Sequence, residues 1–445
     1  MRKFFVALAL LGVSGASAAA QQNQQLTLDE ALAIARARNP AYRQAQARFS
    51  SAAASVRSGF GSMLPQISAR TTFAGASRTT VTGEDDFGEP IDLPNPITFR
   101  SSSVSQAISA NMTLFDGFRN MNRLRAARGR ANAAEFGIQS ALVTLEGEVT
   151  RRFYDAVRSL RLIEVEQQLF VSAQGQLDAT ERLFRVAGAT QVDVLGAQVD
   201  VSRQELAVDR ARGNSRRSFL RLEQQIGINP GTDVSVVGDF PEPFDPAELN
   251  PDSLVARARR NSPRVSQLEA NAGASRSQAT ATRGGRWPTV SAGVDFSRAA
   301  SLNDYDAFFR LNPRNRSFRF NLSVQIPIFD GFSTSSLIAE ADMSAIIAEE
   351  DLREGILQVE QQVRSAVIDL ENTYEALQVE LRALELSRRQ LGLAQQQYRL
   401  GAINFTNLQT VRERAAQAER RAVNAEYDLA AALATLEEAV GQDVR

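Results

Sequence analysis

The chain has 445 residues and a formal net charge of −1, and it contains neither cysteine nor histidine. These absences exclude disulfides, thiolate chemistry, imidazole bases and the usual nitrogen or sulfur ligands of metals. The balance of 50 basic and 51 acidic residues also argues against nucleic-acid binding, which would require a strongly basic face.

Residues 1–20 are organised as a secretory signal peptide. Arg2 and Lys3 precede an apolar run, and small alanines close the segment, so we expect cleavage before Gln21. A transmembrane anchor is the alternative, but the apolar run is shorter than the roughly 20 residues of a spanning helix. No later stretch predicts a membrane-spanning helix.

The mature chain is predicted to begin with a long helix that a proline interrupts. Thr27 and Glu30 have the spacing of a capping box ahead of the segment 31–57, in which Pro40 is the interruption. Residues 254–282 repeat this helical design later in the chain.

After Pro65 and again after Pro288, the pattern changes to an alternation of apolar and polar residues. This period of two predicts strands. The alternating segments are residues 67–73, 104–114, 290–296 and 318–328. This alternation fits two kinds of strand equally well: a tilted transmembrane β-strand, or a strand of a soluble sandwich with one solvated face. The signal peptide favours the membrane strand.

Four strands are too few to close a membrane barrel, whose smallest examples have about 8. An open sheet in lipid would leave its edge groups unpaired, so the barrel must be shared between copies of the chain. Three copies give twelve strands, and two copies give eight with a filled lumen.

Long helical patterns without proline follow at residues 118–184 and 332–398. Each is followed by a glycine-containing turn and a return segment, which in the second copy has apolar residues at intervals of seven from Leu408 to Leu436. This pattern predicts two antiparallel coiled-coil hairpins. Val367, Tyr374 and Leu381 add apolar positions beside the main column. These fit either a helix packed on two neighbours or a broad amphipathic face.

The sequence is internally duplicated. Residues 114–118 (LFDGF) return as 328–332 (IFDGF), and the heptad columns that follow coincide at the same shift. The first copy is nine residues longer between Pro65 and Asp116 than the second is between Pro288 and Asp330. A repeat of this length predicts two large equivalent halves rather than a solenoid.

A proline-rich segment, residues 227–251, joins the halves and is predicted to be a linker or small strand region around Val234 to Val237. The predicted segments are a signal peptide (1–20), a first-repeat helix (21–64), strand pair (65–115) and hairpin (116–227), the linker (228–251), and a second-repeat helix (252–286), strand pair (287–329) and hairpin with C-terminus (330–445).

The order of these features resembles the TolC-type outer-membrane efflux and secretion family. The likeness rests on residues 26–40, on the paired Phe-Asp-Gly-Phe turns and on residues 398–441, and it covers nearly the whole mature chain. The resemblance implies a mixed α and β fold: a trimeric transmembrane β-barrel with four strands per protomer, twelve in total, continued by a long periplasmic α-helical coiled-coil barrel.

The same resemblance implies a passive export duct in the outer membrane of a Gram-negative bacterium, within a tripartite efflux or type I secretion system. It implies no cofactor. The implied partners are two further copies in a homotrimer, a periplasmic adaptor (membrane fusion) protein, an inner-membrane transporter of RND, ABC or MFS type, and outer-membrane lipid. Opening would be an untwisting of the tip helices that adaptor binding selects.

The resemblance also assigns roles to residues. The hairpin tips that would dock the adaptor are Arg185, Gly188, Ala189 and Thr190, and Arg399, Gly401, Ala402 and Ile403. The periplasmic aperture would be lined by Asp193, Asn407 and Thr410. The turns between barrel and helices would be Pro65, Asp116, Gly117, Pro288, Asp330 and Gly331.

Two departures from the family pattern accompany these assignments. Gly188 and Gly401 are both expected to end their helices in the left-handed conformation, although Ala187 is the residue that aligns with Gly401. Asn407 and Thr410 stand where many relatives have aspartates, so cation selectivity of the closed aperture is not implied.

Three other functions compete with the duct. An enzyme could use the carboxylates Glu84, Asp85 and Asp86 or Asp304 and Asp306, but these lie in turn-rich loops without a nucleophile, where solvated loop charge is the simpler explanation. The second alternative is a periplasmic coiled-coil scaffold, which could be extracted from cells without detergent. A porin would lack the hairpins. The sequence contains no glycine-rich phosphate loop followed by lysine, so it does not predict an ATP site.

Overall fold

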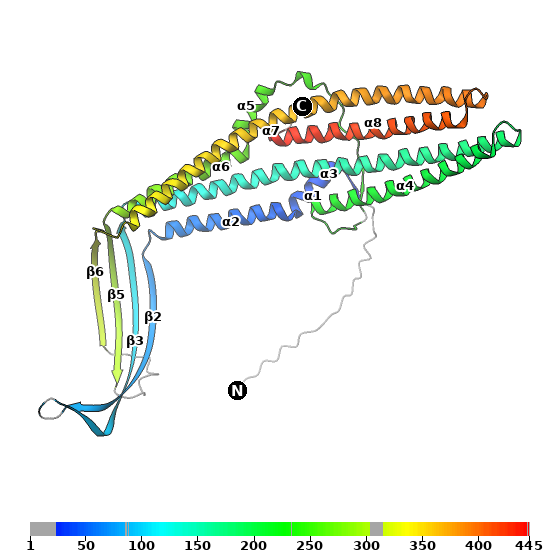
Figure 1. The fold of residues 1–445 in the computed structure, drawn as a ribbon. Helices are drawn as coiled ribbons and strands as arrows, with labels where there is room; N and C mark the ends of the chain where they lie inside the picture. The colour runs from blue at the N-terminus through cyan, green and yellow to red at the C-terminus, as the bar shows by residue number, and fades with distance from the viewer. Residues whose placement is uncertain are drawn as a thin grey trace, which may run out of the picture. The chain divides into compact units, whose positions relative to one another are not determined.

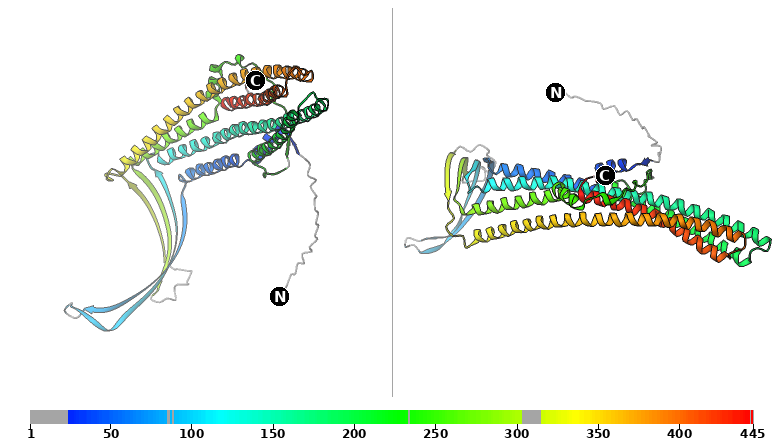
Figure 2. Two further views of the ribbon diagram at one scale, coloured as in Figure 1. Left: turned by 45° about the vertical axis from the view of Figure 1, so that its right-hand side comes forward. Right: turned by 90° about the horizontal axis from the view of Figure 1, so that it is seen from above.

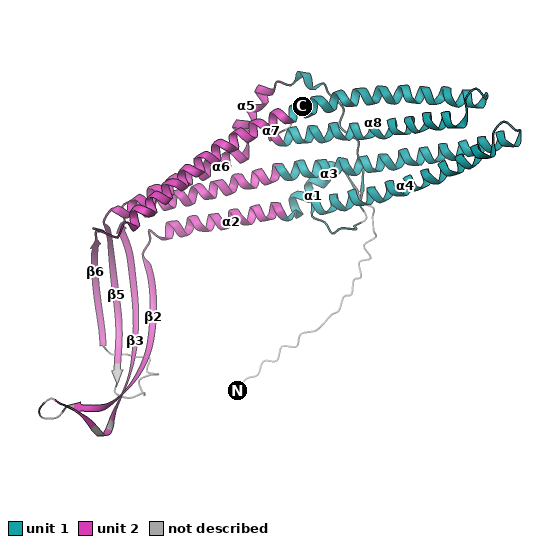
Figure 3. Cartoon of the chain, viewed as in Figure 1, with its two compact units in different colours: residues 1–40, 144–249, 366–438 teal, residues 41–143, 250–365, 439–445 magenta. Residues whose placement is uncertain are grey.

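The computed structural model describes residues 24–84, 87, 89–232, 234–302, 315–442 and 444. The predicted signal peptide and the carboxylates Asp85, Asp86, Asp304 and Asp306 lie outside the described residues. Two compact units divide the chain: unit 1 contains residues 1–40, 144–249 and 366–438, and unit 2 contains residues 41–143, 250–365 and 439–445 (Figure 3).

Helices dominate the fold (Figure 1). The elements are β1 (Gln24–Leu26), α1 (Leu28–Arg38), α2 (Pro40–Gly61), β2 (Gln66–Glu84), β3 (Pro90–Phe115), α3 (Arg119–Arg185), α4 (Gln191–Ile226), β4 (Val234–Val236), η1 (Pro246–Glu248), α5 (Pro251–Asn261), α6 (Pro263–Arg283), η2 (Gly284–Arg286), β5 (Thr289–Leu302), β6 (Asn315–Gln325), α7 (Ser333–Arg399) and α8 (Phe405–Val440). Among the described residues, no helix is both long and apolar enough to cross a membrane.

The predicted helices and their interruptions are confirmed. Thr27 and Glu30 form the capping box of α1, and Pro40 begins α2. Pro263 separates α5 from α6 in the same way in the second copy. A proline is tolerated in the first turn of a helix because its missing N–H has no intrahelical acceptor there.

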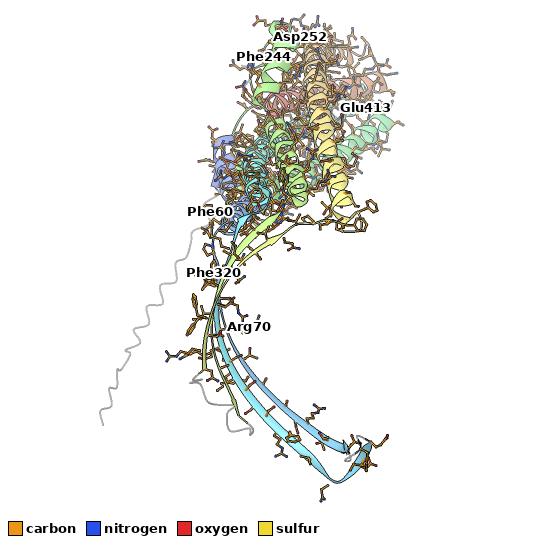
Figure 4. The ribbon with its side chains drawn as sticks, turned by 90° about the vertical axis from the view of Figure 1, so that its left-hand side faces the viewer. Phe60, Arg70, Phe244, Asp252, Phe320 and Glu413 are labelled. Carbon is orange, nitrogen blue, oxygen red and sulfur yellow. The ribbon has the colours of Figure 1, made fainter. Side chains whose placement is uncertain are left out.

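Unit 2 contains one antiparallel sheet with the strand order β2-β3-β5-β6. One face carries apolar side chains such as Ile67, Phe296 and Phe320, and the other carries polar ones such as Arg70 and Asp295. Figure 4 shows Phe320 and Arg70 on this sheet. All of β6 is exposed, so a single copy covers neither face of this strand.

The first-copy strands are longer than predicted and longer than their counterparts. β2 and β3 have 19 and 26 residues, against 14 and 11 in β5 and β6. Among the described residues, β5 pairs with β3 from Ser102 onward, and β2 and β3 continue beyond this point as a two-stranded ribbon. The prediction that the last strand reaches Ile328 was wrong, because β6 ends at Gln325.

Unit 1 contains a small parallel sheet, the whole of α4 and parts of α3, α7 and α8. β1 pairs with β4, which confirms a short strand in the linker and joins residues 24–26 to it. The helices lie side by side in the order α4, α3, α8, α7 (Figures 1 and 2). α3 and α7 have 67 residues each, as the uninterrupted helical patterns predicted.

Candidate functional site

The two Phe-Asp-Gly-Phe turns have the same geometry. In each turn the aspartate accepts a hydrogen bond from the backbone N–H four residues later: Asn120 N to Asp116 Oδ2 is 2.9 Å, and Thr334 N to Asp330 Oδ2 is 2.8 Å. Hydrogen bonds from the hydroxyl and the backbone N–H of Thr334 lower the pKa of Asp330. Each aspartate therefore caps the long helix that follows it.

The glycine and the second phenylalanine of each turn are both left-handed. The φ angles are 67° and 62° at Gly117 and Phe118, and 63° and 67° at Gly331 and Phe332. Left-handed phenylalanine is strained. An edge-to-face contact with the first phenylalanine, at ring-centroid distances of 5.5 and 5.7 Å, accompanies it in both copies.

The surroundings of the two glycines differ. A Cβ atom at Gly117 would lie 2.5 Å from the carbonyl oxygen of Gly284 and 2.6 Å from Cβ of Trp287, whereas a Cβ at Gly331 would meet nothing within 4 Å. The first turn is therefore packed against the chain just ahead of Pro288, and the second is open. Pro65 and Pro288 each directly precede a strand, β2 and β5.

The first hairpin tip joins α3 to α4. Arg185 ends α3, and Ala187 is left-handed with φ 58°, so the expectation that Gly188 would be the left-handed residue was wrong. The Gly188 N–H instead donates to the Leu183 carbonyl oxygen at 2.8 Å. The residue that aligns with Gly401 thus keeps the turn geometry although it is an alanine.

The second tip joins α7 to α8, and Gly401 is left-handed there with φ 72°, as expected. The Ala402 N–H donates to the Gln397 carbonyl oxygen at 2.8 Å, the same bond that Gly188 makes in the first tip. A Cβ at Gly401 would meet nothing within 4 Å. The two tips therefore share one backbone turn with different residues at its strained position.

Exchanging these two residues is expected to change the stability of each tip in opposite directions. A left-handed non-glycine residue costs about 1–2 kcal/mol, so Ala187→Gly slows amide hydrogen exchange at the first tip and Gly401→Ala speeds it at the second. We expect about a fivefold change in exchange rate for each, measured by mass spectrometry on the tip peptides. Ala189→Gly is the control, and slower exchange in this control would contradict the assignment to Ala187.

The predicted aperture residues are held by local bonds. The Asp193 carboxylate accepts hydrogen bonds from the Thr190 N–H and hydroxyl, both at 2.8 Å, and so completes a capping box at the start of α4. The Thr410 hydroxyl donates to the Thr406 carbonyl oxygen at 3.1 Å. The Asn407 N–H donates to Asn404 Oδ1 at 2.9 Å. Asn404 therefore caps the start of α8 as Thr190 caps the start of α4.

A cluster that the sequence did not single out joins the two hairpins. Phe405, the first residue of α8, packs with Tyr398 and Leu408 and with Ala197 of α4. A Cβ at Gly196 would lie 3.0 Å from the Phe405 ring, so the helices approach closely there. The heptad pattern marked Tyr398 and Leu408 as apolar, but nothing in it indicated that the first hairpin would supply the other side.

Ion pairs also join the hairpins, and the sequence gave no sign of them. The Arg420 guanidinium of α8 donates to both oxygens of the Glu166 carboxylate on α3, and these bonds raise the pKa of Arg420. Arg412 of α8 pairs with Asp200 of α4 at 3.0 Å, and burial lowers the pKa of Arg412. Partners more than 200 residues apart carry no local sequence signature.

Comparison with known proteins gives a consistent picture. The model of the family described as Outer membrane efflux protein matches residues 31–228 and 254–442, which are the two repeats. The chain is 25% identical to the CyaE protein of Bordetella pertussis over 317 residues, 71% of this chain and 62% of that protein, so it spans less than two thirds of that relative's length. It is 22% identical to the outer membrane protein TolC of Escherichia coli over 96% of this chain and 84% of that protein.

The fold is also shared with solved structures. The outer membrane channel CmeC of Campylobacter jejuni superposes with a TM-score of 0.76 at 15% identity, over 93% of this chain and 85% of that chain. At this identity the likeness shows the fold. It shows the mixed arrangement of a four-stranded sheet and long helical hairpins that the sequence predicted.

Proposed function

This chain belongs to the outer membrane efflux protein family, and from that membership we propose that it is the outer-membrane channel of a tripartite efflux or type I secretion system. Family and fold are those of channel proteins rather than enzymes. The duct is passive. It extends into the periplasm, where it meets a periplasmic adaptor and an inner-membrane transporter.

The exposure of the sheet is the observation that carries this proposal. β2 and β6 are the outer strands of the sheet, and in the described part of the chain each pairs on one side only. The apolar face exposes Ile67, Phe318, Phe320 and Leu322 by 59–74%. A soluble sheet with such a face would bury it in its own core. Lipid against this face and a barrel closed by three copies satisfy both requirements.

The outer helices of unit 1 support the same assembly. α4 and α7 each carry an apolar stripe at intervals of seven that no other described part of the chain covers. The residues, 39–76% exposed, are Val192, Val199, Leu206 and Leu220 on α4, and Val379, Leu386 and Leu393 on α7. In a ring of three copies, α4 of one copy would meet α7 of the next, and both stripes would become buried.

The hairpin tips are the proposed docking points for the adaptor: Arg185, Gly188, Ala189 and Thr190 in the first, and Arg399, Gly401, Ala402 and Ile403 in the second. Both turns end their helices abruptly and leave their backbones exposed at Gly188 and Gly401, which favours close approach of a partner. We assign the periplasmic aperture to Asp193, Asn407 and Thr410, with Asp193 supplying its only carboxylate.

Disulfide trapping tests the ring, because a chain without cysteine gives no background. We expect Val199→Cys on α4, combined in turn with Val379→Cys, Leu386→Cys or Leu393→Cys on α7, to give a covalent trimer for at least one pair. The readout is denaturing electrophoresis of membranes oxidised before extraction. Arg212→Cys, outside the α4 stripe, replaces Val199→Cys as the control.

Two outcomes would sink the proposal. A protein that is released from cells without detergent and stays monomeric for every pair would be a periplasmic scaffold. Cross-linked ladders without a closed species would indicate filaments rather than a ring.

A further inference from the structure

One face of α4 carries four arginines without an acidic partner. Arg203, Arg210, Arg217 and Arg221 form no ion pair with any described carboxylate, and Arg217 donates only to the neutral Asn214. Arg212, on another face of the same helix, pairs with Asp209 at 3.5 Å. Successive arginines seven residues apart are about 10 Å apart, so the four guanidinium groups form a row.

These arginines line one wall of a cavity of about 480 Å³ in unit 1. Leu162 and Ser159 of α3 contribute to its lining, and Arg420 and Asn424 of α8 complete it. Its one carboxylate, Glu166, already binds Arg420 and Gln204.

The charge of a sixth arginine of the lining is already paired within the chain. Arg158 pairs with Asp155 and lies 4.2 Å from the centre of the Tyr427 ring. The α4 row is therefore the unneutralised part of the cavity, with four positive charges.

The chemistry of the row defines a ligand. Guanidinium groups stay charged at every physiological pH and bind carboxylate, sulfonate or phosphate oxygens in pairs. Like charges close together on a helix destabilise it, so an anion that neutralises the row would stabilise α4. Ala207, Ala211 and Leu162 give the same cavity an apolar patch.

We propose that this cavity binds amphipathic organic anions that carry at least two acidic groups. The acidic groups contact the arginine row, and the apolar body lies against Leu162, Ala207 and Ala211. A volume of about 480 Å³ falls within the roughly 300–1,000 Å³ of small-molecule sites. On the proposed function, this is a site for acidic cargo of the duct, and that part of the inference rests on the duct.

The arginine row lies directly beside the apolar stripe that we assign to the neighbouring copy, because Arg203 is four residues after Val199 and three before Leu206. Arg203, Arg210 and Arg217 repeat at sevens, and the apolar stripe with Val199 and Leu206 repeats at sevens in a different heptad position of α4. A neighbouring copy that buries the stripe therefore passes next to the row, so the binding test is made on the assembled trimer.

Calorimetric titration of the assembled trimer in an uncharged detergent tests the proposal. The probe is naphthalene-1,5-disulfonate, which has two sulfonates on an apolar ring system. We expect the affinity for the probe to fall as the salt concentration rises. We also expect the double variant Arg210→Gln/Arg217→Gln to bind the probe about tenfold or more weakly, because each substituted position loses charge-assisted hydrogen bonds. The matched control, Arg212→Gln/Arg216→Gln, removes two exposed arginines of the same helix outside this cavity and should change binding by less than about twofold.

Three results would overturn it. Equal weakening in both double variants would mean general attraction by a basic helix. If pyrophosphate binds as tightly as the disulfonate, the apolar residues of the cavity contribute nothing to binding. Binding by dissociated monomers but not by the trimer would mean that a neighbouring copy fills the cavity. The titration involves no transport, so its failure leaves the duct standing, and failure of disulfide trapping leaves the binding result standing.

Discussion

Gly117→Ala is expected to destabilise the protein by roughly 2–5 kcal/mol, whereas the equivalent Gly331→Ala costs about 1 kcal/mol. Both substitutions place an alanine in the left-handed conformation. Only the first also drives a Cβ atom to 2.5 Å from the Gly284 carbonyl oxygen, against backbone that cannot move aside independently. The measurement is the midpoint of thermal unfolding of the helices, followed by circular dichroism in mild detergent.

A third variant separates the two contributions. Gly284 has an ordinary φ of −58°, but a Cβ there would lie 2.6 Å from the Gly117 carbonyl oxygen. Gly284→Ala therefore adds the close contact without the left-handed strain. Its unfolding midpoint should lie between those of Gly117→Ala and Gly331→Ala. Equal midpoints for Gly117→Ala and Gly331→Ala would show that the first turn is not packed as described.

The duplicated turns also show what the sequence could and could not predict. Two copies of Phe-Asp-Gly-Phe predicted one turn used twice, and the backbone angles of Gly117 and Gly331 agree within a few degrees. Their different surroundings were not predictable, because the packing partner, Trp287, is 170 residues away from Gly117 and has no equivalent contact at Gly331.

Helix lengths were predictable because they depend on local signals. Prolines, capping residues and an apolar interval of seven are all near neighbours in the chain, and they placed α3 and α7 within a residue of their observed ends. Strand ends were less predictable. The end of a strand depends on its hydrogen-bonded partner, and β2 and β3 extend as far as they pair with each other.

The candidate site divides in the same way. Gly401 was identifiable from turn chemistry and has the expected left-handed angle, whereas the helix cap made by Thr190 was not predicted. Gly188 was assigned the left-handed position because glycine is the usual occupant, and Ala187 occupies it instead, since the helix length fixes where the turn falls. Contacts between the two hairpins, such as Phe405 with Ala197, depend on how the helices pack and left no pattern in either helix alone.

Glu166→Ala is expected to destabilise unit 1 by about 3 kcal/mol, since it leaves the half-buried Arg420 without its carboxylate and Gln204 without its acceptor. Glu166 is 7% exposed. The control removes the carboxylate of Asp239, which pairs with Arg161 but has a side chain that is 83% exposed. Asp239→Ala should cost less than about 1 kcal/mol, because water and salt screen exposed pairs. Urea unfolding of the detergent-solubilised protein, followed by circular dichroism, measures both.

Removing both partners distinguishes an ion pair that stabilises from one that is only costly to break. Glu166→Met/Arg420→Met leaves no buried charge, so it should recover most of the stability that Glu166→Ala loses. If the double variant is as unstable as the single one, the pair holds α3 against α8 through a geometry that apolar side chains cannot replace. If Glu166→Ala matches Asp239→Ala, the two hairpins are held together by the Tyr398, Phe405 and Leu408 cluster, and Glu166 contributes little.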